Sequence, residues 1–324
     1  MNEITEILQL TPGKARGKFN EKMLKSKLFV GEEKLDGERF LLHCKIGKNR
    51  FTSRHISVKN NLFVEKTENV PHLRDLFARN GLDIEFDGTV LDGEIVVGNQ
   101  SQSTRVSKIM GALPEKAVRL QNENMWVDYR VFDILYFKNR DLRALPYEER
   151  RNILVDNFSS IGSKYFNIVP ATNEDKEEYF NTIVANGGEG MILKNIKSPY
   201  AKDWIKIKKE ATYDCVIIGF EEPTKITKKS SGEESISRLY KYGWIGAIKF
   251  GQFYSGKLIE FGSCSGMDDA MREEISNNKD KYLGKVIEIK ANDRFPTGRF
   301  RHPRFIRFRP DKNPQDCVYR AGEC

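Results

Sequence analysis

Short apolar runs separated by turn residues dominate the chain after residue 27. These runs predict strands, and their close spacing is typical of antiparallel pairing. The predicted strands are Leu28–Val30, Phe40–Cys44, Thr89–Val97 and Trp126–Tyr136. Apolar residues also recur at the three- and four-residue intervals of a helical face. They predict helices over Val70–Asn80, Tyr147–Phe158 and Asp175–Asn186.

A second pattern begins after Lys208, where five apolar runs enclose one helical stretch. The five predicted strands are Asp214–Glu222, Trp244–Phe250, Lys257–Gly262, Lys285–Lys290 and Arg304–Arg309. The helix, Asp268–Asn277, lies between the third and fourth strands, and its two leading acids suit the positive end of a helix. This order is typical of an OB-fold barrel. We therefore predict an α+β protein with a mainly antiparallel domain over residues 1–210 and an OB-fold domain over 211–324.

One long polar stretch, Pro223–Tyr242, interrupts the second pattern and is rich in Ser, Lys and Glu. It is consistent with a mobile loop or with an extended hairpin. The length of 324 residues also corresponds to about two domains.

The charge balance suggests a partner class without fixing it. Lys and Arg total 54 against 46 Asp and Glu, a formal net charge of +8. This surplus favours a polyanionic partner, but it is modest and many small-molecule enzymes share it. Aromatic residues make up 11% of the chain, which excludes a disordered protein.

Several classes are excluded by composition. No apolar run approaches the ~20 residues of a membrane span, and the N-terminus lacks the pattern of a secretory signal. The five cysteines are scattered without a C-x-x-C pair, and the four histidines show no H-x-x-x-H spacing. This argues against a disulfide framework and against zinc hydrolysis. We expect a protein of the reducing cytoplasm, without a membrane.

The pattern K-x-D-G-x-R at Lys34–Arg39 is the first chemical signal. It fixes four positions, and a chain of this length shows it by chance on the order of once in a hundred. Six further motifs follow it in order. They are Ser53-Arg54, Leu91-Asp92-Gly93-Glu94, Phe132-Asp133-Ile134-Leu135, Glu189-Gly190-Met191-Ile192-Leu193-Lys194 and Trp204-Ile205-Lys206-Ile207-Lys208, with Arg301–Lys312 at the end.

Alternation in the Trp204–Lys208 motif places Lys206 and Lys208 on one strand face. Two ammonium groups directed at one pocket would repel a third, which would favour the neutral, nucleophilic amine of Lys34 and attract a triphosphate. The alternative is a half-exposed strand with solvated lysines.

This ordered set resembles the motifs of the covalent nucleotidyltransferases, and the Pro303–Lys312 ending resembles that of ATP-dependent DNA ligases. The resemblance extends from Lys34 to Lys312. It implies that Lys34 attacks the α-phosphorus of ATP, forms a lysyl–AMP, and passes AMP to the 5′-phosphate of nicked duplex DNA. The 3′-hydroxyl then displaces AMP. We expect a monomer of minimal two-domain type, without the N-terminal DNA-binding domain of larger ligases, that acts in DNA repair, replication or recombination.

The resemblance also assigns carboxylates to a metal. Glu189 and Glu94 are the candidate ligands of Mg²⁺, with Mn²⁺ as an alternative, and Glu94 is also implied in ribose binding. Mg²⁺ usually takes only one or two protein carboxylates beside phosphate oxygens. The competing interpretations are a hairpin turn at Asp92-Gly93 and a surface acid at Glu189.

Four further residues are candidates for nucleotide binding. The family places an aromatic residue, here Phe132, against adenine, and Glu32 is positioned to meet the base edge. Arg39 and Arg54 offer planar forks for phosphate or ribose oxygens. The alternatives are a core phenylalanine, a surface acid and two surface ion pairs.

Six arginines and no acid occur between Arg294 and Arg309, interleaved with four phenylalanines. This composition suits phosphate contacts and a stacking or packing surface. In the family, Arg309, Asp311 and Lys312 belong to a lid that closes over ATP and orients pyrophosphate. The Pro223–Tyr242 stretch is a hypothetical DNA clamp.

Two other functions are consistent with parts of the sequence. An RNA ligase or a capping guanylyltransferase shares the lysine motif, and GTP use would identify the latter. A non-catalytic OB-fold protein that binds nucleic acid would need no Lys34 and would leave the N-terminal motifs unexplained.

Overall fold

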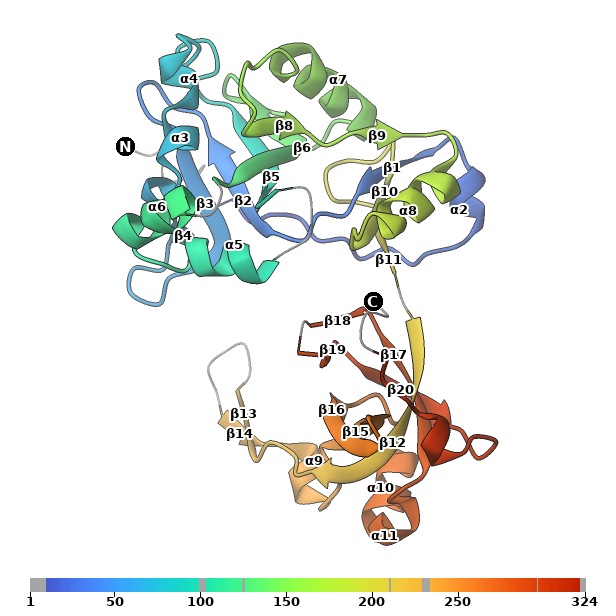
Figure 1. Ribbon diagram of the computed structural model, residues 1–324. Helices are drawn as coiled ribbons and strands as arrows, with labels where there is room; N and C mark the ends of the chain where they lie inside the picture. The colour runs from blue at the N-terminus through green and yellow to red at the C-terminus, as the bar shows by residue number, and fades with distance from the viewer. Residues whose placement is uncertain are drawn as a thin grey trace. The chain divides into compact units, whose positions relative to one another are not determined.

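The computed structural model describes residues 10–98, 103–123, 126–209, 211–228, 234–295 and 297–320. The chain divides into two compact units, Met1–Lys208 and Lys209–Cys324, each with its own hydrophobic core (Figure 1). Residue 210, at the predicted domain boundary, lies outside the described residues.

A seven-stranded sheet forms the larger part of the first unit. Six of its strands run in the order β4 (Phe63–Glu65), β3 (Arg50–Ile56), β2 (Glu38–His43), β5 (Val90–Val96), β6 (Asp128–Phe137) and β7 (Arg140–Asp141). They pair antiparallel, while β8 (Phe166–Ile168) pairs parallel with β6. Alternation along β2 sends Phe40 and Leu42 into the main core and leaves Arg39 on the other face.

Helices of the described part of the first unit pack around this sheet. They are α3 (Pro71–Arg74), α4 (Leu76–Arg79), α5 (Ser103–Met110), α6 (Pro114–Glu123) and α7 (Tyr147–Phe158). The bounds predicted for α7 are confirmed. The single helix predicted over residues 70–80 is wrong, because the chain turns at Asp75 between α3 and α4. The Asp75 carboxylate accepts from Arg74 Nε at 2.6 Å and pairs with Arg79 at 3.2 Å, which stabilises the break.

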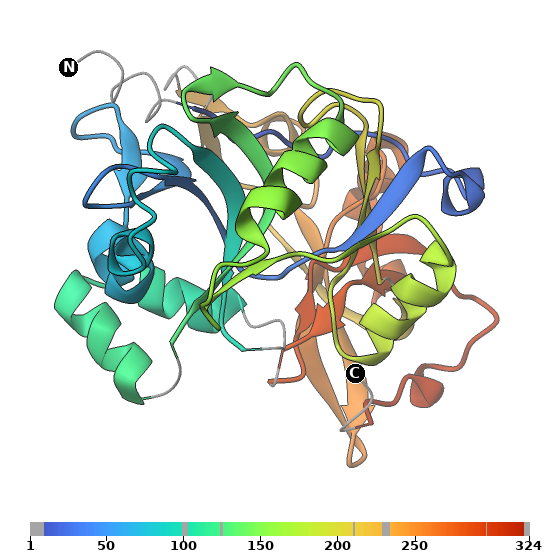
Figure 2. The same cartoon turned by 90° about the horizontal axis from the view of Figure 1, so that it is seen from above.

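A four-stranded antiparallel sheet completes the first unit, in the order β11 (Trp204–Lys208), β10 (Gly190–Asn195), β1 (Phe29–Glu33) and β9 (Ala171–Thr172). Its apolar face packs on α8 (Lys176–Ala185), which itself contacts α2 (Lys22–Lys25) (Figures 1 and 2). Met191, Leu193 and Ile205 form this small core with Ile183. Alternation therefore sends Glu32, Lys194, Lys206 and Lys208 to the opposite face.

The second unit is built on a five-stranded antiparallel sheet. Its order is β16 (Lys257–Cys264), β15 (Ala247–Tyr254), β12 (Ala211–Glu221), β17 (Val286–Ala291) and β20 (Arg304–Phe308). A parallel bridge between Ser265 and Arg304 joins the two outer strands and closes the barrel. The helix α10 (Asp269–Asn277) lies between the third and fourth strands, and Asp268 caps it by accepting from the Met271 N–H at 2.8 Å. This strand order confirms the predicted OB fold.

The second unit also contains shorter strands and helices outside the five-stranded sheet. The strands β13 (Ile226–Lys228) and β14 (Glu234–Ile236) pair antiparallel and precede α9 (Arg238–Lys241), so the polar stretch contains a hairpin. Residues 229–233, within the same stretch, lie outside the described part. The helix α11 (Lys279–Tyr282) follows α10, and β18 (Asp293–Arg294) pairs with β19 (Phe300–Arg301). Among the described helices, none has the length and apolar character needed to cross a membrane.

Candidate active site

One carboxylate, that of Glu189, holds Lys34 and Lys208 together. Lys34 directly follows β1, and its N–H donates to the Gly190 carbonyl at 2.8 Å, which fixes it beside the start of β10. Its ammonium group forms an ion pair with one oxygen of Glu189, and Lys208 Nζ lies 2.6 Å from the other. The three side chains are only 22%, 9% and 26% exposed. Three predicted site residues therefore meet around one anion.

A glycine makes this approach possible. Gly190 has φ of +145°, and a Cβ there would lie 2.1 Å from the Ile207 carbonyl oxygen. A larger residue would therefore push β10 away from β11. Lys206 lies two residues before Lys208 and is exposed. The structure thus brings Lys208 to the Lys34 pair, while Lys206 stands open to solvent.

Glu94 lies on β5, directly opposite Arg39 of β2. Burial raises the pKa of Glu94 to about 7, and the negative charges of Asp92 and Glu189 add to this effect. The positive charges of Lys34 and Arg39 oppose the rise without cancelling it. Two carboxylates, those of Glu189 and Glu94, therefore act on the Lys34 ammonium.

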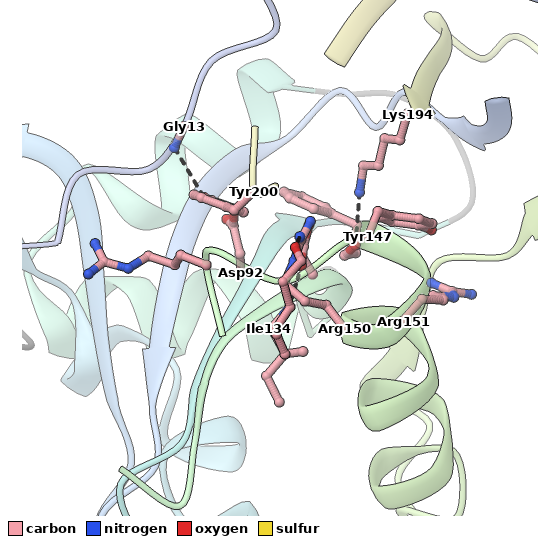
Figure 3. Close-up of polar contacts among 12 residues, drawn as sticks. Gly13, Asp92, Ile134, Tyr147, Arg150, Arg151, Lys194 and Tyr200 are labelled. Atoms are coloured by element: carbon pink, nitrogen blue, oxygen red, sulfur yellow. Dashed lines mark hydrogen bonds and ion pairs between the residues drawn. The ribbon is translucent and has the colours of Figure 1, made fainter. Parts of the chain in front are cut away.

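Arg39 is held by a compact polar cluster that the sequence did not predict, and Figure 3 labels the cluster members Gly13, Asp92 and Tyr200. Its guanidinium forms a two-point ion pair with the fully buried Asp92, with the Nε contact at 2.8 Å, and donates to the Gly13 carbonyl. Tyr200 Oη donates to Asp92, and it accepts from the Gly13 N–H and from Arg39 Nη2, both at 3.0 Å. One hydroxyl donor and two acceptor sites are thereby all used. Burial alone would lower the pKa of Arg39, but the neighbouring acidic groups, chiefly Asp92, together have the larger effect, so the pKa of Arg39 is raised above its ordinary value.

Phe132 is half-buried on β6 and lies outside the main hydrophobic core. The Arg39 guanidinium lies 5.1 Å from its ring centroid, and Trp204 meets it edge-on at 6.0 Å. The interpretation of Phe132 as a core residue is therefore wrong. Asp92-Gly93 lies within β5, so the hairpin-turn interpretation of this pair is wrong as well.

Glu32 is buried at 2% exposure, which rules out a surface acid. Lys194 Nζ lies 2.7 Å from its carboxylate, and Tyr147 donates a hydrogen bond to it (Figure 3). The Lys194 ammonium also donates to the Phe132 carbonyl at 2.8 Å, and it lies 4.4 Å from the Trp204 ring centroid. A single buried ammonium thus links β10 to β6 and compensates the charge of Glu32.

Sequence reasoning missed Lys194, although its signal was present. The residue follows the apolar run Met191–Leu193 in β10, and a lysine that is fully buried must have a charged partner. The buried Asp133–Arg150 pair, at 2.7 and 2.9 Å, joins β6 to α7 next to this site and was also unpredicted. Arg54 is exposed at the end of β3, and its role stays a prediction.

The lid candidates form their own cluster in the second unit. Arg309 pairs with Asp311 at 2.8 Å and with Asp214 of β12 at 3.0 Å, and Lys312 lies 3.8 Å from Asp214. The hydrogen bond from Arg309 lowers the pKa of Asp311 to about 2. Asp214 contacts two of the three predicted residues, Arg309 and Lys312, and was not predicted itself.

Neighbouring strands supply acids to the arginine-rich segment. Arg307 pairs with Glu288 of β17 at 2.6 Å, and Arg299 lies 3.7 Å from Glu260 of β16. Phe300 and Phe305 are buried in the barrel core, so they pack and do not stack on an external surface. Arg299 and Arg307 therefore have acidic partners that lie elsewhere in the sequence.

The carboxylates around Lys34 fit a magnesium ion that also binds phosphate. The described residues contain no cluster of three or more His, Cys, Asp or Glu that could hold a metal alone. Mg²⁺ takes only one or two protein carboxylates beside substrate phosphates, a number that Glu189 and Glu94 match. The donor set therefore suits a metal that arrives with a nucleotide.

Comparison with known proteins identifies the family. A family model described as an ATP dependent DNA ligase domain matches residues 14–208, and the chain belongs to that family. The DNA ligase of Methanocorpusculum labreanum is 28% identical over 313 residues, covering 88% of this chain and 52% of that protein. DNA ligase 4 of Emericella nidulans is 32% identical over 222 residues, covering 59% and 21%. The chain thus spans about half, or less, of these relatives.

Solved structures share the fold. A structure from an analysis of Lig E DNA ligases superposes with a TM-score of 0.61 at 17% identity, covering 93% of this chain and 98% of that one. The ligase domain of LigD from M. tuberculosis gives a TM-score of 0.52 at 20% identity, covering 97% and 99%. The predicted architecture, an adenylation domain followed by a β domain, is confirmed.

The Tyr200 hydroxyl should stabilise the Arg39 cluster. Tyr200→Phe keeps the ring but leaves the buried Asp92 without one donor and the Gly13 N–H without its acceptor. We expect a loss of about 1–3 kcal/mol in the free energy of unfolding, measured with urea. The control is Tyr165→Phe, whose hydroxyl has no hydrogen-bond partner within the described residues. Equal effects of the two substitutions would contradict this role of Tyr200.

Glu94 should make stability depend on pH. Its pKa is about 7 in the folded protein and 4.5 ordinarily, so the folded state holds a proton that the unfolded chain releases. The wild type should therefore lose up to about 3 kcal/mol between pH 4.5 and 7 through this group. Glu94→Gln should remove that loss and be more stable than wild type at pH 8 but not at pH 4.5. The exposed Glu115→Gln is the control and should follow the wild type. If the free energy of unfolding of Glu94→Gln depended on pH in the same way as that of the wild type, the assignment would be refuted.

Proposed function

We propose that this chain is an ATP-dependent DNA ligase that seals nicks in duplex DNA. One observation carries the proposal: the lysine of the K-x-D-G-x-R motif shares a carboxylate with Lys208, at the junction of β1, β10 and β11. These strands lie within residues 14–208, which match the ligase family. An amine held among charged groups of both signs suits attack on a polyphosphate.

The first step joins the protein to the nucleotide. Lys34 Nζ attacks the α-phosphorus of ATP, a phosphorus–nitrogen bond forms, and the bond to the bridging oxygen of the β-phosphate breaks. Pyrophosphate leaves, and the amine gives up a proton. Lys208 attracts the triphosphate, and the exposed Lys206 adds to that attraction. The 5′-phosphate of the nick then accepts AMP, and the 3′-hydroxyl displaces it.

The surrounding residues bind and orient the nucleotide. Phe132 packs against adenine, Glu32 accepts from the base edge, and Arg39 and Arg54 contact phosphate or ribose oxygens. The fixed position of Arg39, held by Asp92 and Tyr200, supports this assignment. Glu94 contacts the ribose. Glu32 is itself fixed by Lys194, so the base edge meets a rigid acceptor.

Mg²⁺, or Mn²⁺ in its place, would be held by Glu189 and Glu94 and would neutralise charge on the phosphate oxygens. Arg309, Asp311 and Lys312 would act as the lid that orients pyrophosphate. The ion pairs of Arg309 with Asp311 and Asp214, and the contact of Lys312 with Asp214, support a common role. We place the domain boundary at residues 210 and 211. The partner is nicked duplex DNA, the enzyme acts as a monomer, and its role lies in repair, replication or recombination.

Loss of the Lys34 amine should abolish the reaction. With ATP labelled in the α-phosphate, Lys34→Ala should take up no label, and nick sealing should fall on the order of a thousandfold or more. The exposed Lys164→Ala is the control and should keep both activities. Labelling from GTP instead of ATP would favour a capping guanylyltransferase. DNA binding without any covalent label would favour a non-catalytic protein.

The proposed lid residue Arg309 should affect the rate of AMP transfer to the enzyme more than the rate of nick sealing. Arg309→Ala should slow transfer of AMP to the enzyme about a hundredfold, because it removes a cation from the departing pyrophosphate. The rate at which the variant seals a nick that already carries AMP should change much less. Lys257→Ala, an exposed cation on the same barrel, serves as the control. Equal slowing of both steps would contradict the lid role.

A further inference from the structure

The segment before β1 concentrates positive charge. Between residues 14 and 27 there are six basic residues and one acid, Glu21, a surplus of five out of the net +8 of the whole chain. We call this segment the basic strap; its cations are Lys14, Arg16, Lys18, Lys22, Lys25 and Lys27. All six side chains are exposed, and none forms an ion pair within the described ranges.

The first half of the strap is fixed to the domain by two glycines. Gly13 is bound to both Tyr200 and Arg39, and the Gly17 N–H donates to the Trp204 carbonyl of β11 at 3.0 Å. A Cβ on Gly13 would lie 2.0 Å from Ala201 Cβ, and one on Gly17 would lie 2.4 Å from Ile205 Cγ1. The backbone therefore lies in close contact with the chain around β11.

This placement brings the strap beside the active site. β11 is the edge strand of the four-stranded sheet, and it carries the exposed Lys206 together with Lys208. Gly13 itself contacts Arg39, which lies against Phe132. The strap cations are thus attached to the same strand that supplies lysines to the site.

Some exposed cations elsewhere in the first unit have acidic partners. Lys48 pairs with Glu68 at 2.7 Å, and Lys197 pairs with Glu148. The strap lacks such partners, so its like charges repel one another on a backbone that is held in place. A polyanion relieves that repulsion and releases its own counterions on binding. Surface charge of one sign on a fixed segment therefore indicates a partner with regularly spaced negative charges.

We propose that the basic strap binds the sugar–phosphate backbone of duplex DNA next to the nucleotide site. This inference rests on the proposed ligase function, because it identifies the surface of the first unit that holds that enzyme's substrate. Binding is independent of base sequence, since lysines on phosphates position a duplex without reading it. The strap also couples DNA to the nucleotide site through Gly13 and its contact with Arg39.

The test replaces the three strap cations beside the glycines. The triple variant Lys14→Gln, Arg16→Gln, Lys18→Gln is compared with a control that loses the same charge, Lys116→Gln, Arg140→Gln, Lys164→Gln, all exposed. Affinity for nicked duplex is measured over a range of salt concentrations. We expect the strap variant to bind at least about tenfold more weakly at moderate salt, with a slope of log affinity against log salt smaller by about 2–3. Transfer of AMP from ATP to Lys34 should stay unchanged, which also reports an intact fold.

Different outcomes separate the two proposals. If the wild type neither takes up AMP nor binds nicked DNA, the proposed function fails. If the wild type does both, and the strap variant keeps wild-type affinity and salt slope, the inference about the strap is overturned. A strap variant that keeps its DNA affinity but is no longer retained on phosphatidylserine vesicles would assign the surface to an anionic membrane and also overturn it. A second variant, Lys22→Gln, Lys25→Gln, Lys27→Gln, applies the same criteria to the rest of the strap.

Discussion

The bridge between Lys34, Glu189 and Lys208 is the interaction on which the site depends. Two ammonium groups this close would repel strongly without the carboxylate between them, and the carboxylate would be costly to bury without the cations. The bridge also joins the end of β1 to the start of β10 and the end of β11. The same three side chains therefore hold the ends of these three strands together and present an amine, an acid and a cation to a polyphosphate.

This arrangement follows from the two faces of the four-stranded sheet. Met191, Leu193 and Ile205 pack on α8 and hold the strands in register. Strand alternation then directs the polar residues toward the seven-stranded sheet, where Lys194 reaches Glu32 and the Phe132 carbonyl. The apolar face of the sheet stabilises the fold, and the opposite face holds the polar side chains of the candidate active site. A buried ammonium that satisfies groups on both sheets fixes how they face each other within the first unit.

Much of the fold could be predicted from local sequence patterns, because strands, helix caps and motif order depend on residues that are close together in the sequence. The α7 bounds, the Asp268 cap and the barrel order are examples. The contacts that the sequence analysis did not predict join residues that are far apart in the sequence. They are those of Tyr200 with Asp92 and Gly13, and that of Lys194 with Glu32. At the break between α3 and α4, two arginines bind the Asp75 carboxylate, a contact that hydrophobic periodicity does not reveal. The acids that pair with the arginine-rich segment also come from other strands.

The central claim is that the amine at position 34, among its neighbouring lysines, forms the covalent bond to the nucleotide. Mass mapping of peptides after incubation with ATP and Mg²⁺ tests this most directly, because it separates Lys34 from Lys206 and Lys208 by position in the chain. The account predicts one adenylate on the peptide that contains Lys34, removed again when nicked duplex is added. An adenylate on a β11 lysine, or no adenylate on any peptide, would contradict it.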